Sequence, residues 1–480
     1  MFQIKLLLCN VVLWLSLLPE AIRYFIALLS PKRAQKKVLL QILNKMNMSE
    51  SEFYKQPVTQ YDDYVSQIEI LRKNGVHPTY HEDVSRLCPT SGTSGTNKLI
   101  PYTKSLKSAF QAGLYPWIFF MYLRFPSLFF KRQYWSVTPV VKTQLDEDTG
   151  KIKIGFEDDE EYVGKLQQLI TKMIWVNTKE VAKESPSVEI FLSKLATQLS
   201  QERHLGLVSV WSPSLISLLV KKHDSVLQNN CVLSSWAHGY SEEESASVVK
   251  ITKTRLQPKG LLSTEACVTI PIGTETFFFS YNSHYFEFRN TAGGELETVT
   301  TLEVGNEYEV IVTTQSGFVR YATGDIVRVT KKVFGRPSCV FIGRTGVVDL
   351  FGEKLDELTV EKAVGELLTE IKVKDVFWFL SPTRDAEGTT AYTLFIASQV
   401  VGVALTKTLD NLLRRSYHYN YCRELGQLGE ARVFVIEEQT PEARFIETSS
   451  LESGARLGDI KMKRLSKKVD WHEKFSGYFV

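Results

Sequence analysis

One short segment constrains this chain more than any other. From position 91 to 96 every residue is Ser, Thr or Gly, and Asn97 and Lys98 follow before an apolar run that begins at Leu99. The glycines allow a backbone to approach a ligand closely, the hydroxyls can donate to anionic oxygens, and the lysine adds a positive charge. These residue types favour a loop that holds the phosphates of a nucleotide. A solvent-exposed Ser/Gly linker is the alternative, but linkers seldom lead directly into an apolar run.

The loop is not a Walker A motif. In that motif a glycine directly precedes the lysine, whereas two residues separate Gly95 from Lys98 here. Pro101 also disfavours a helix directly after the lysine. The sequence therefore predicts a polyphosphate loop of another class, with these candidate residues: Ser91, Gly92, Thr93, Ser94, Gly95 and Lys98.

Composition sets broad limits on the protein. A chain of 480 residues has room for one large domain and a smaller one, and 44% apolar with 23% charged residues is ordinary for a globular core. A net charge of +3 gives no reason to expect a nucleic-acid partner. The six cysteines are widely spaced without a CxxC pair, which indicates free thiols in a reducing compartment. The eight histidines show no metal-ligand spacing.

The N-terminus, residues 1–33, is hydrophobic and expected to be helical. One apolar run covers 6–18 and a second covers 21–29, with Pro19 and Glu20 between them and a basic run at 32–37. Three interpretations are open, in this order of preference: a packed helical hairpin, a helix on the inner membrane face with its basic end toward anionic lipid, and a signal anchor. Residues 5–37 are thus a candidate membrane-surface contact on a protein otherwise expected to be cytoplasmic.

The pattern along the chain predicts an α/β fold. Segments 34–47, 60–73 and 105–120 carry helical spacing, and a buried strand at 205–211 followed by a helix at 215–226 reads as a βα unit of a doubly wound sheet. Short runs between 266 and 342 predict an antiparallel sheet or distorted barrel. We expect a large N-terminal domain, residues 1–345, with parallel sheets and a β-rich subdomain.

A small mobile α/β domain is expected over residues 346–480. Its predicted order is a helix at 354–368, strands at 373–380 and 390–398, a helix at 406–422 and a strand at 431–438.

In the N-terminal domain, the predicted helix at 105–120 has a strongly aromatic continuation to Phe130. This aromatic stripe fits core packing and an apolar substrate tunnel about equally well.

Three later clusters carry chemistry. Thr264 and Glu265 follow a turn, where a carboxylate beside a hydroxyl can bind Mg²⁺. Asp325, expected between two strands after Gly324, can accept from paired ribose hydroxyls. Arg344 stands at the inferred domain boundary, among glycines that suit a rotating joint. Taken singly, a surface Glu and a turn Asp are the simpler interpretations.

Ordered together, the loop and these clusters resemble the adenylate-forming enzymes, and more closely the acyl acid–amido synthetases, the auxin-responsive Gretchen Hagen family. The resemblance covers the chain from about residue 30 onward and rests on these motifs: the loop with Lys98-Leu-Ile-Pro-Tyr, Gly260-Leu-Leu-Ser-Thr-Glu265, Tyr321-Ala-Thr-Gly-Asp325 and Leu350-Phe-Gly-Glu-Lys-Leu355. Leu261 and Ala322 depart from the superfamily pattern, which has Tyr and Arg there.

The resemblance implies roles for individual residues. The loop would hold the ATP phosphates with Lys98 as counter-charge, Glu265 would coordinate Mg²⁺, and Thr264 would touch the α-phosphate. Tyr321 would pack near the adenine, Asp325 would hold the ribose and Arg344 would reach the nucleotide. Lys461 is similar to the mobile lysine of the small domain in that family, although a solvated lysine in a basic tail is an equal alternative.

The implied activity is ATP-dependent adenylation of a carboxylic acid, followed by transfer of the acyl group to an amine. The expected amine is an amino acid. Two alternatives remain open. An acyl- or aryl-CoA ligase would share the first step and use a thiol in the second. A non-catalytic, membrane-associated scaffold or binding protein has no need of a charged loop together with Glu265 and Asp325.

Overall fold

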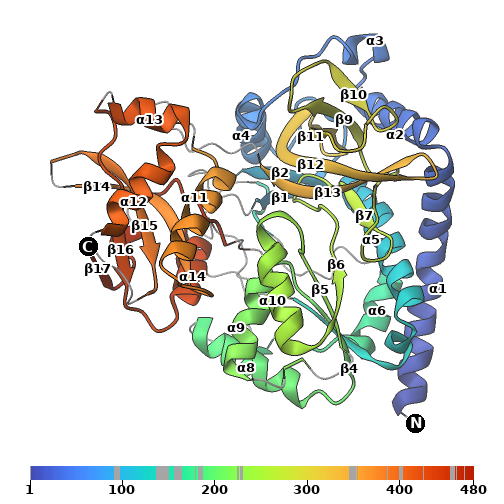
Figure 1. Ribbon diagram of the computed structural model, residues 1–480. Coiled ribbons are helices and arrows are strands. Elements are labelled where there is room, and N and C mark those ends of the chain that lie inside the picture. The colour runs from blue at the N-terminus through green and yellow to red at the C-terminus, as the bar shows by residue number, and fades with distance from the viewer. Residues whose placement is uncertain are drawn as a thin grey trace. The chain divides into compact units, whose positions relative to one another are not determined.

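The computed structural model describes most of the chain. It covers residues 2–90, 98–136, 151–155, 165–178, 180–181, 188–223, 226–227, 231–344, 353, 355–385, 387–398, 404–424, 426–453, 460, 462–469 and 471–480. These residues divide into two compact units, the first reaching to Arg344 and the second made mainly of Thr345–Ser453 and Ile460–Val480 (Figure 1).

The N-terminus is one long helix. α1 (Phe2–Leu29) continues through Pro19, so the two apolar runs do not form a helical hairpin and that prediction is wrong. Its buried residues recur at helical spacing and pack on two helices, α5 (Lys104–Arg124) and α6 (Lys165–Ile174). Since Pro19 lies on the exposed side, the hydrogen bond it removes leaves a carbonyl that water can reach.

Short helices and one hairpin follow α1. α2 (Pro31–Lys45) begins with proline at its first turn, where the missing N–H costs nothing. The predicted helices at 34–47 and 60–73 are confirmed, the second as η1 with α4. The remaining elements of this region are α3 (Glu50–Phe53), η1 (Tyr61–Tyr64), α4 (Val65–Asn74), β1 (Val84–Pro89), β2 (Leu99–Thr103) and η2 (Pro126–Phe130).

A four-stranded parallel sheet forms the middle of the first unit. Its strands lie in the order β3-β4-β5-β6, each parallel to the next. The predicted βα unit is confirmed, but the described strands run in sequential order without the reversal that defines a doubly wound sheet. The elements are β3 (Arg132–Trp135), α8 (Val188–Gln201), β4 (Leu205–Ser209), α9 (Pro213–Lys222), β5 (Val232–Ser235), α10 (Glu242–Thr252) and β6 (Arg255–Pro258).

The predicted β-rich region is a seven-stranded antiparallel sheet, in the order β10-β9-β11-β12-β13-β8-β7. The largest hydrophobic core of this unit gathers its inner face together with residues of α1, α4 and α5. A short 3-10 turn, η5 (Gly239–Ser241), precedes α10. The strands are β7 (Thr269–Pro271), β8 (Phe277–Phe279), β9 (Tyr285–Asn290), β10 (Leu296–Thr298), β11 (Glu307–Thr313), β12 (Tyr321–Val333) and β13 (Arg336–Arg344).

The second unit is a small α/β sandwich with the strand order β14-β15-β16-β17. The predicted helix at 406–422 is two helices, because the chain turns at 414–416, and the strand predicted from 373 starts only at Trp378. Its elements are α11 (Glu357–Glu370), β14 (Trp378–Arg384), β15 (Thr390–Ile396), α12 (Ala404–Leu413), α13 (Tyr417–Glu424), β16 (Arg432–Ile436), α14 (Pro441–Ser453), η7 (Trp471–Glu473) and β17 (Gly477–Phe479).

Candidate functional site

The Ser/Thr/Gly loop is bracketed by an antiparallel hairpin. β1 and β2 pair up to Pro89 and Leu99, and beyond them Thr90 N donates to Lys98 O at 2.9 Å. The Thr90 hydroxyl is buried and bonds to no described residue. Residues 91–95, the predicted phosphate holders, lie outside the described residues. The hairpin therefore fixes both ends of the segment that carries them.

Lys98 points into an aromatic and acidic environment. Its Nζ donates to the Tyr321 hydroxyl at 3.3 Å and lies 5.5 Å from the centre of the Tyr61 ring. Burial lowers the pKa of Lys98, Glu265 raises it, and Arg344 lowers it. The lysine thus lies within electrostatic range of three charged side chains that come from distant parts of the sequence, Glu265, Arg344 and Asp325.

A tight turn carries Thr264 and Glu265. Ser263 N donates to the carbonyl of Ala266 at 2.9 Å, and Ala266 N donates back to the Ser263 hydroxyl at 3.3 Å. The turn puts Thr264 at a partly exposed position, whereas Glu265 is only 4% exposed. A buried carboxylate is costly unless a cation neutralises it, which makes Glu265 more than a surface residue.

Asp325 lies inside a strand, not between two strands as predicted. In the pairing of β11 with β12, Glu309 faces Ile326 and Ile311 faces Ala322, so the intervening residues form a bulge. Gly324 occupies the left-handed region there, at a φ of 76°. Bulges re-aim side chains, and this one turns the Asp325 carboxylate inward, where it is 2% exposed.

Arg344 is the ion-pair partner of Asp325. The two residues face each other across β12 and β13, and Arg344 Nε donates to Asp325 Oδ1 at 2.7 Å. The arginine side chain is 39% exposed, and the Asp325 charge raises its pKa. The second carboxylate oxygen, Oδ2, is buried and accepts no hydrogen bond from any described residue.

The fold brings the described candidates of the first unit together. Glu265 and Asp325 each act to raise the pKa of Lys98 and that of Arg344, although the four residues come from four separate segments. Tyr321 joins them through its hydroxyl, but its ring is fully buried against Phe318, with the centroids 5.0 Å apart. No ring face of Tyr321 is open to an adenine. Lys461 lies outside the described residues.

These residues fit a nucleotide with its metal. A buried carboxylate oxygen without a donor, Asp325 Oδ2, suits a sugar hydroxyl, because the hydroxyl would supply the missing hydrogen bond. Mg²⁺ in nucleotide sites takes one or two carboxylates and completes its shell with phosphate oxygens and water. Glu265, which lies close enough to raise the pKa of Lys98, is the carboxylate available for that role.

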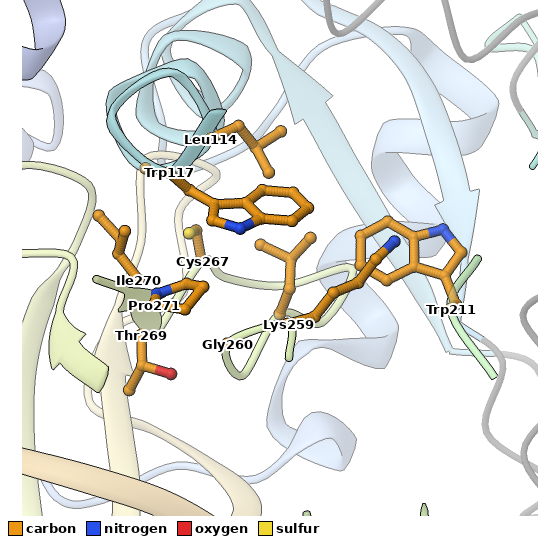
Figure 2. A pocket seen from close by; sticks show the side chains of 11 residues that line it. Leu114, Trp117, Trp211, Lys259, Gly260, Cys267, Thr269, Ile270 and Pro271 are labelled. Atoms are coloured by element: carbon orange, nitrogen blue, oxygen red, sulfur yellow. The ribbon is translucent and has the colours of Figure 1, made fainter. Parts of the chain in front are cut away.

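A pocket opens beside the same turn (Figure 2). It encloses about 260 Å³ of empty space, including that at its mouth, between α5 and the strands that follow Lys259. Leu262 and Cys267, which bridge at the base of the Glu265 turn, form part of its wall. The lining is largely apolar and comprises Gly113, Leu114, Trp117, Trp211, Lys259, Gly260, Leu262, Cys267, Thr269, Ile270 and Pro271.

Two residues that line this apolar pocket carry polar groups. Lys259 is 6% exposed, and its Nζ lies 3.8 Å from the centre of the Trp211 ring and 5.7 Å from that of Trp117. Trp117 Nε1 is buried and donates to no described residue. Figure 2 shows the Lys259 side chain extending to the Trp211 ring, with the Trp117 indole on the α5 side of the pocket. A cation and an indole N–H together suit an anionic or electron-rich ligand.

Sequence reasoning missed Lys259 as a site residue. The signal was its position directly before Gly260, at the start of the motif that carries Glu265. Of the aromatic stripe, Trp117 lines the pocket, whereas Phe119 stacks on Trp14 of α1 with ring centres 4.7 Å apart. Most of the stripe is helix packing, because these further members lie in the clusters that α5 and η2 share with α1: Tyr115, Phe120, Tyr122, Phe125 and Phe129.

The chain is similar to known proteins both in fold and in sequence. Among solved structures, the fold is similar to that of the GH3.15 acyl acid amido synthetase, with a TM-score of 0.72 over 94% of both chains at 16% identity. Two family models match the chain: the GH3 family N-terminal domain over residues 30–232 and the GH3 family central domain over residues 277–344. The chain belongs to the GH3 family, as the sequence motifs predicted.

Curated relatives align over shorter stretches. The probable indole-3-acetic acid-amido synthetase GH3.1 of Arabidopsis thaliana is 38% identical over 84 residues, which are 17% of this chain and 14% of that protein. The 4-substituted benzoates-glutamate ligase GH3.12 of Arabidopsis thaliana is 26% identical over 219 residues, 40% of this chain and 37% of that protein. Each alignment spans less than half the length of the relative.

Proposed function

We propose that this protein is an ATP-dependent acyl acid–amido synthetase, which adenylates a carboxylic acid and transfers the acyl group to an amine. One observation carries the proposal: the buried carboxylates of Asp325 and Glu265 lie around Lys98, at the base of the Ser/Thr/Gly loop. Arg344 neutralises Asp325 through one oxygen only and leaves Oδ2 buried without a donor. A magnesium–nucleotide complex would supply that donor and would place a metal ion beside the buried Glu265.

In the first step, the carboxylate oxygen of the acid attacks the α-phosphorus of ATP. The bond between that phosphorus and the bridging oxygen breaks, so pyrophosphate leaves and an acyl-adenylate remains. AMP is then the leaving group for the second nucleophile, which makes the later step easier than direct attack on a carboxylate. Charge develops on the phosphoryl oxygens during the attack, and fixed cations stabilise it.

The roles of the individual side chains follow from their environments. Glu265 would hold Mg²⁺, Thr264 would donate to the α-phosphate, and the loop residues 91–95 would donate to the other phosphates beside Lys98. Asp325 would accept from a ribose hydroxyl through Oδ2, since Oδ1 already accepts from Arg344. Because its ring is buried, we assign Tyr321 to positioning Lys98 through the bond to its hydroxyl and not to adenine stacking.

The acid would enter the pocket beside Trp117. The pocket shares its wall with the Glu265 turn, so a ligand there lies next to the proposed nucleotide site. Lys259 and the Trp117 indole N–H favour an acid that carries an aromatic ring or a second electron-rich group. The aromatic and aliphatic lining favours an acid with an apolar body.

In the second step an amine, in our proposal that of an amino acid, attacks the acyl carbon. The carbon–oxygen bond to AMP breaks, an amide forms and the amine loses a proton. Rotation of the 346–480 domain between the steps would exchange the groups that face the adenylate, and Lys461 would act in the first step. Since ATP is a cytosolic substrate, we place the reaction in the cytoplasm.

The test is carboxylate-dependent exchange of pyrophosphate into ATP, measured with purified protein and a panel of aromatic, aliphatic and dicarboxylic acids. We expect Mg²⁺-dependent exchange with at least one acid that has an apolar body, followed by amide formation when amino acids are added. Thioester formation with coenzyme A would replace the amide assignment by that of a CoA ligase. No exchange with any acid, despite ATP binding, would contradict the proposal and favour a non-catalytic binding protein.

A further inference from the structure

The outward side of α1 is apolar over most of its length. Residues on this side recur at spacings of three and four, and only Arg23 among the exposed positions from 8 to 29 carries a charge. Surface helices normally turn a polar face to water. Here the exposed positions are Leu8, Val12, Leu15, Pro19, Ile22, Arg23, Phe25, Ile26 and Leu29, and the large aliphatic and aromatic side chains among them are 45–61% exposed. We call this set the α1 stripe.

The opposite side of α1 belongs to the protein core. Asn10 is fully buried, donates to the carbonyl of Lys131 and accepts from the Tyr122 hydroxyl. The Tyr24 hydroxyl donates to the carbonyl of Phe279 at 3.1 Å. By length and composition α1 could cross a membrane. A crossing would break these polar contacts with β8, α5 and the residue before β3. The docked helix offers only its stripe to another surface.

A second element ends beside the stripe. The hairpin between β12 and β13 turns at Phe334, whose side chain is 95% exposed and whose φ of 50° belongs to a tight turn. Arg336, at the start of β13, donates from Nε to the carbonyl of Leu28 at 2.8 Å and from Nη2 to that of Leu29 at 2.6 Å. The hairpin tip is thereby held at the C-terminal end of α1, as Figure 1 shows. An exposed phenylalanine there extends the apolar surface.

Uncompensated cations surround this end of α1. Lys32, Arg33 and Lys37 are exposed on α2, directly after α1, and Lys332 is exposed near the hairpin tip. None of these four forms an ion pair with a described residue. The neighbouring Arg23 and Lys36 are paired with Glu20 and Glu50. The apolar surface is therefore bordered by positive charge at one end.

We propose that the α1 stripe and the Phe334 tip dock on an anionic membrane surface, with α1 lying in the plane of the interface. An amphipathic helix with an apolar face and adjacent cations binds such surfaces through burial of the apolar face and through attraction of the cations to anionic lipid. A helix of 28 residues is about 42 Å long, which gives a continuous contact. A second copy is a poorer occupant, because it would bring the same cations and no acidic residue on its stripe.

The experiment is vesicle flotation of the full chain. We expect binding to phosphatidylcholine vesicles that contain about 30% phosphatidylserine, weakened on the order of tenfold when the anionic lipid is left out or salt is raised to roughly 1 M. The double variant Ile22→Glu/Ile26→Glu, and separately Phe334→Ser, should each reduce binding. Ile251→Glu is the matched control, since Ile251 is 65% exposed on α10 away from the stripe, and it should bind as the wild type does.

Two outcomes would overturn the inference. If the wild type forms a dimer that the double variant abolishes while neither binds vesicles, a second copy covers the stripe. If the control variant loses vesicle binding as fully as the stripe variant does, binding is unspecific. A thermal melt close to that of the wild type shows that a variant is folded. If the double variant does not fold, Phe334→Ser still tests the inference.

Discussion

Asp325 and Arg344 form an ion pair of 2.7 Å that uses only one of the two carboxylate oxygens. The other, Oδ2, is buried and bonds to no described residue. In most proteins a buried carboxylate has donors for both oxygens. Arg344 thus fixes the orientation of Asp325 and leaves one acceptor free for a ligand. This half-satisfied pair is the feature on which the nucleotide assignment makes its sharpest prediction.

Asp325→Asn should weaken the use of ATP and remove discrimination at the sugar. Because an ionised acceptor contributes about 1.5–3 kcal/mol to a hydrogen bond, we expect the KM for ATP to rise roughly 10- to 100-fold. The wild type should discriminate against 2′-deoxy-ATP or 3′-deoxy-ATP, whereas the variant should use ATP and the deoxy analogue almost equally. Steady-state pyrophosphate exchange measures both effects.

The matched control for that experiment is Glu307→Gln. Glu307 pairs with Arg328 at 2.6 Å in the same sheet, but both side chains are at least one-third exposed. A surface pair of this kind contributes little, so KM should not change. If both analogues remain equally disfavoured in Asp325→Asn, Asp325 does not hold the sugar.

Glu265→Gln should raise the Mg²⁺ concentration required for half-maximal exchange. The amide keeps the shape of the side chain and removes the charge that attracts the ion. We therefore expect the exchange rate to fall tenfold or more at low Mg²⁺ and to recover in part at high Mg²⁺. Glu275→Gln, on an exposed turn of the same region, is the control. A variant whose activity falls without any change in metal dependence would assign Glu265 to another role.

The alkaline limit of activity should report on Lys98. Burial lowers the pKa of this lysine, so it loses its charge at a lower pH than a lysine in water, and exchange should decline there as pH rises. The Glu265 charge raises the same pKa, so in Glu265→Gln the decline should move to still lower pH. Lys98→Arg should move it upward. Exchange rates across the alkaline range, at saturating Mg²⁺, test the order of the three proteins.

Periodicity predicted much of the fold because most elements bury one face. The helices at 34–47 and 105–120 and the strands between 266 and 342 carry that signal in their own residues. The sequence did not predict one long N-terminal helix, because a proline such as Pro19 usually ends or kinks a helix. A proline on the solvent side of a helix removes a hydrogen bond that water replaces, and the packing of Leu13, Leu17 and Ala21 on the inward side holds the helix together.

The sequence predicted which types of residue form the site, but it did not predict their geometry. The motifs identified Lys98, Glu265 and Asp325, yet nothing local indicates that Arg344 satisfies one oxygen of Asp325 alone. That depends on the register of β12 against β13 and on the bulge at Gly324. Lys259 was missed for a similar reason: its environment is made by Trp117 and Trp211, which are distant in sequence.

Acid sensitivity of the fold should depend on His284. Burial lowers the pKa of this histidine from its ordinary 6.5 to about 3, and neither ring nitrogen bonds to a described residue. The unfolded chain therefore binds a proton that the folded chain excludes. Stability is full above pH 6.5 and falls as pH drops toward 3, by at most about 1.4 kcal/mol per pH unit from this group.

His284→Leu should flatten this acid limb, because it removes the group whose protonation favours unfolding. Urea denaturation between pH 7 and 4 measures the slope. His81→Leu is the control, since His81 is exposed and its replacement should leave the slope unchanged. Equal slopes for the wild type and His284→Leu would show that other groups govern acid unfolding.

Variants of Trp117 and Phe119 should distinguish a substrate-binding residue of α5 from a packing residue of the same helix. Trp117→Phe keeps an aromatic ring and removes the indole N–H that bonds to no described residue. If the acid accepts that hydrogen bond, its KM should rise roughly tenfold, at 1–1.5 kcal/mol, with little loss of stability. Phe119 stacks on Trp14 away from the pocket, so Phe119→Ala should cost about 3 kcal/mol of folding free energy and leave the KM for the acid unchanged. Thermal unfolding and exchange kinetics on both variants test this division, and an increased KM in Phe119→Ala would mean that the acid site extends along α5 toward α1.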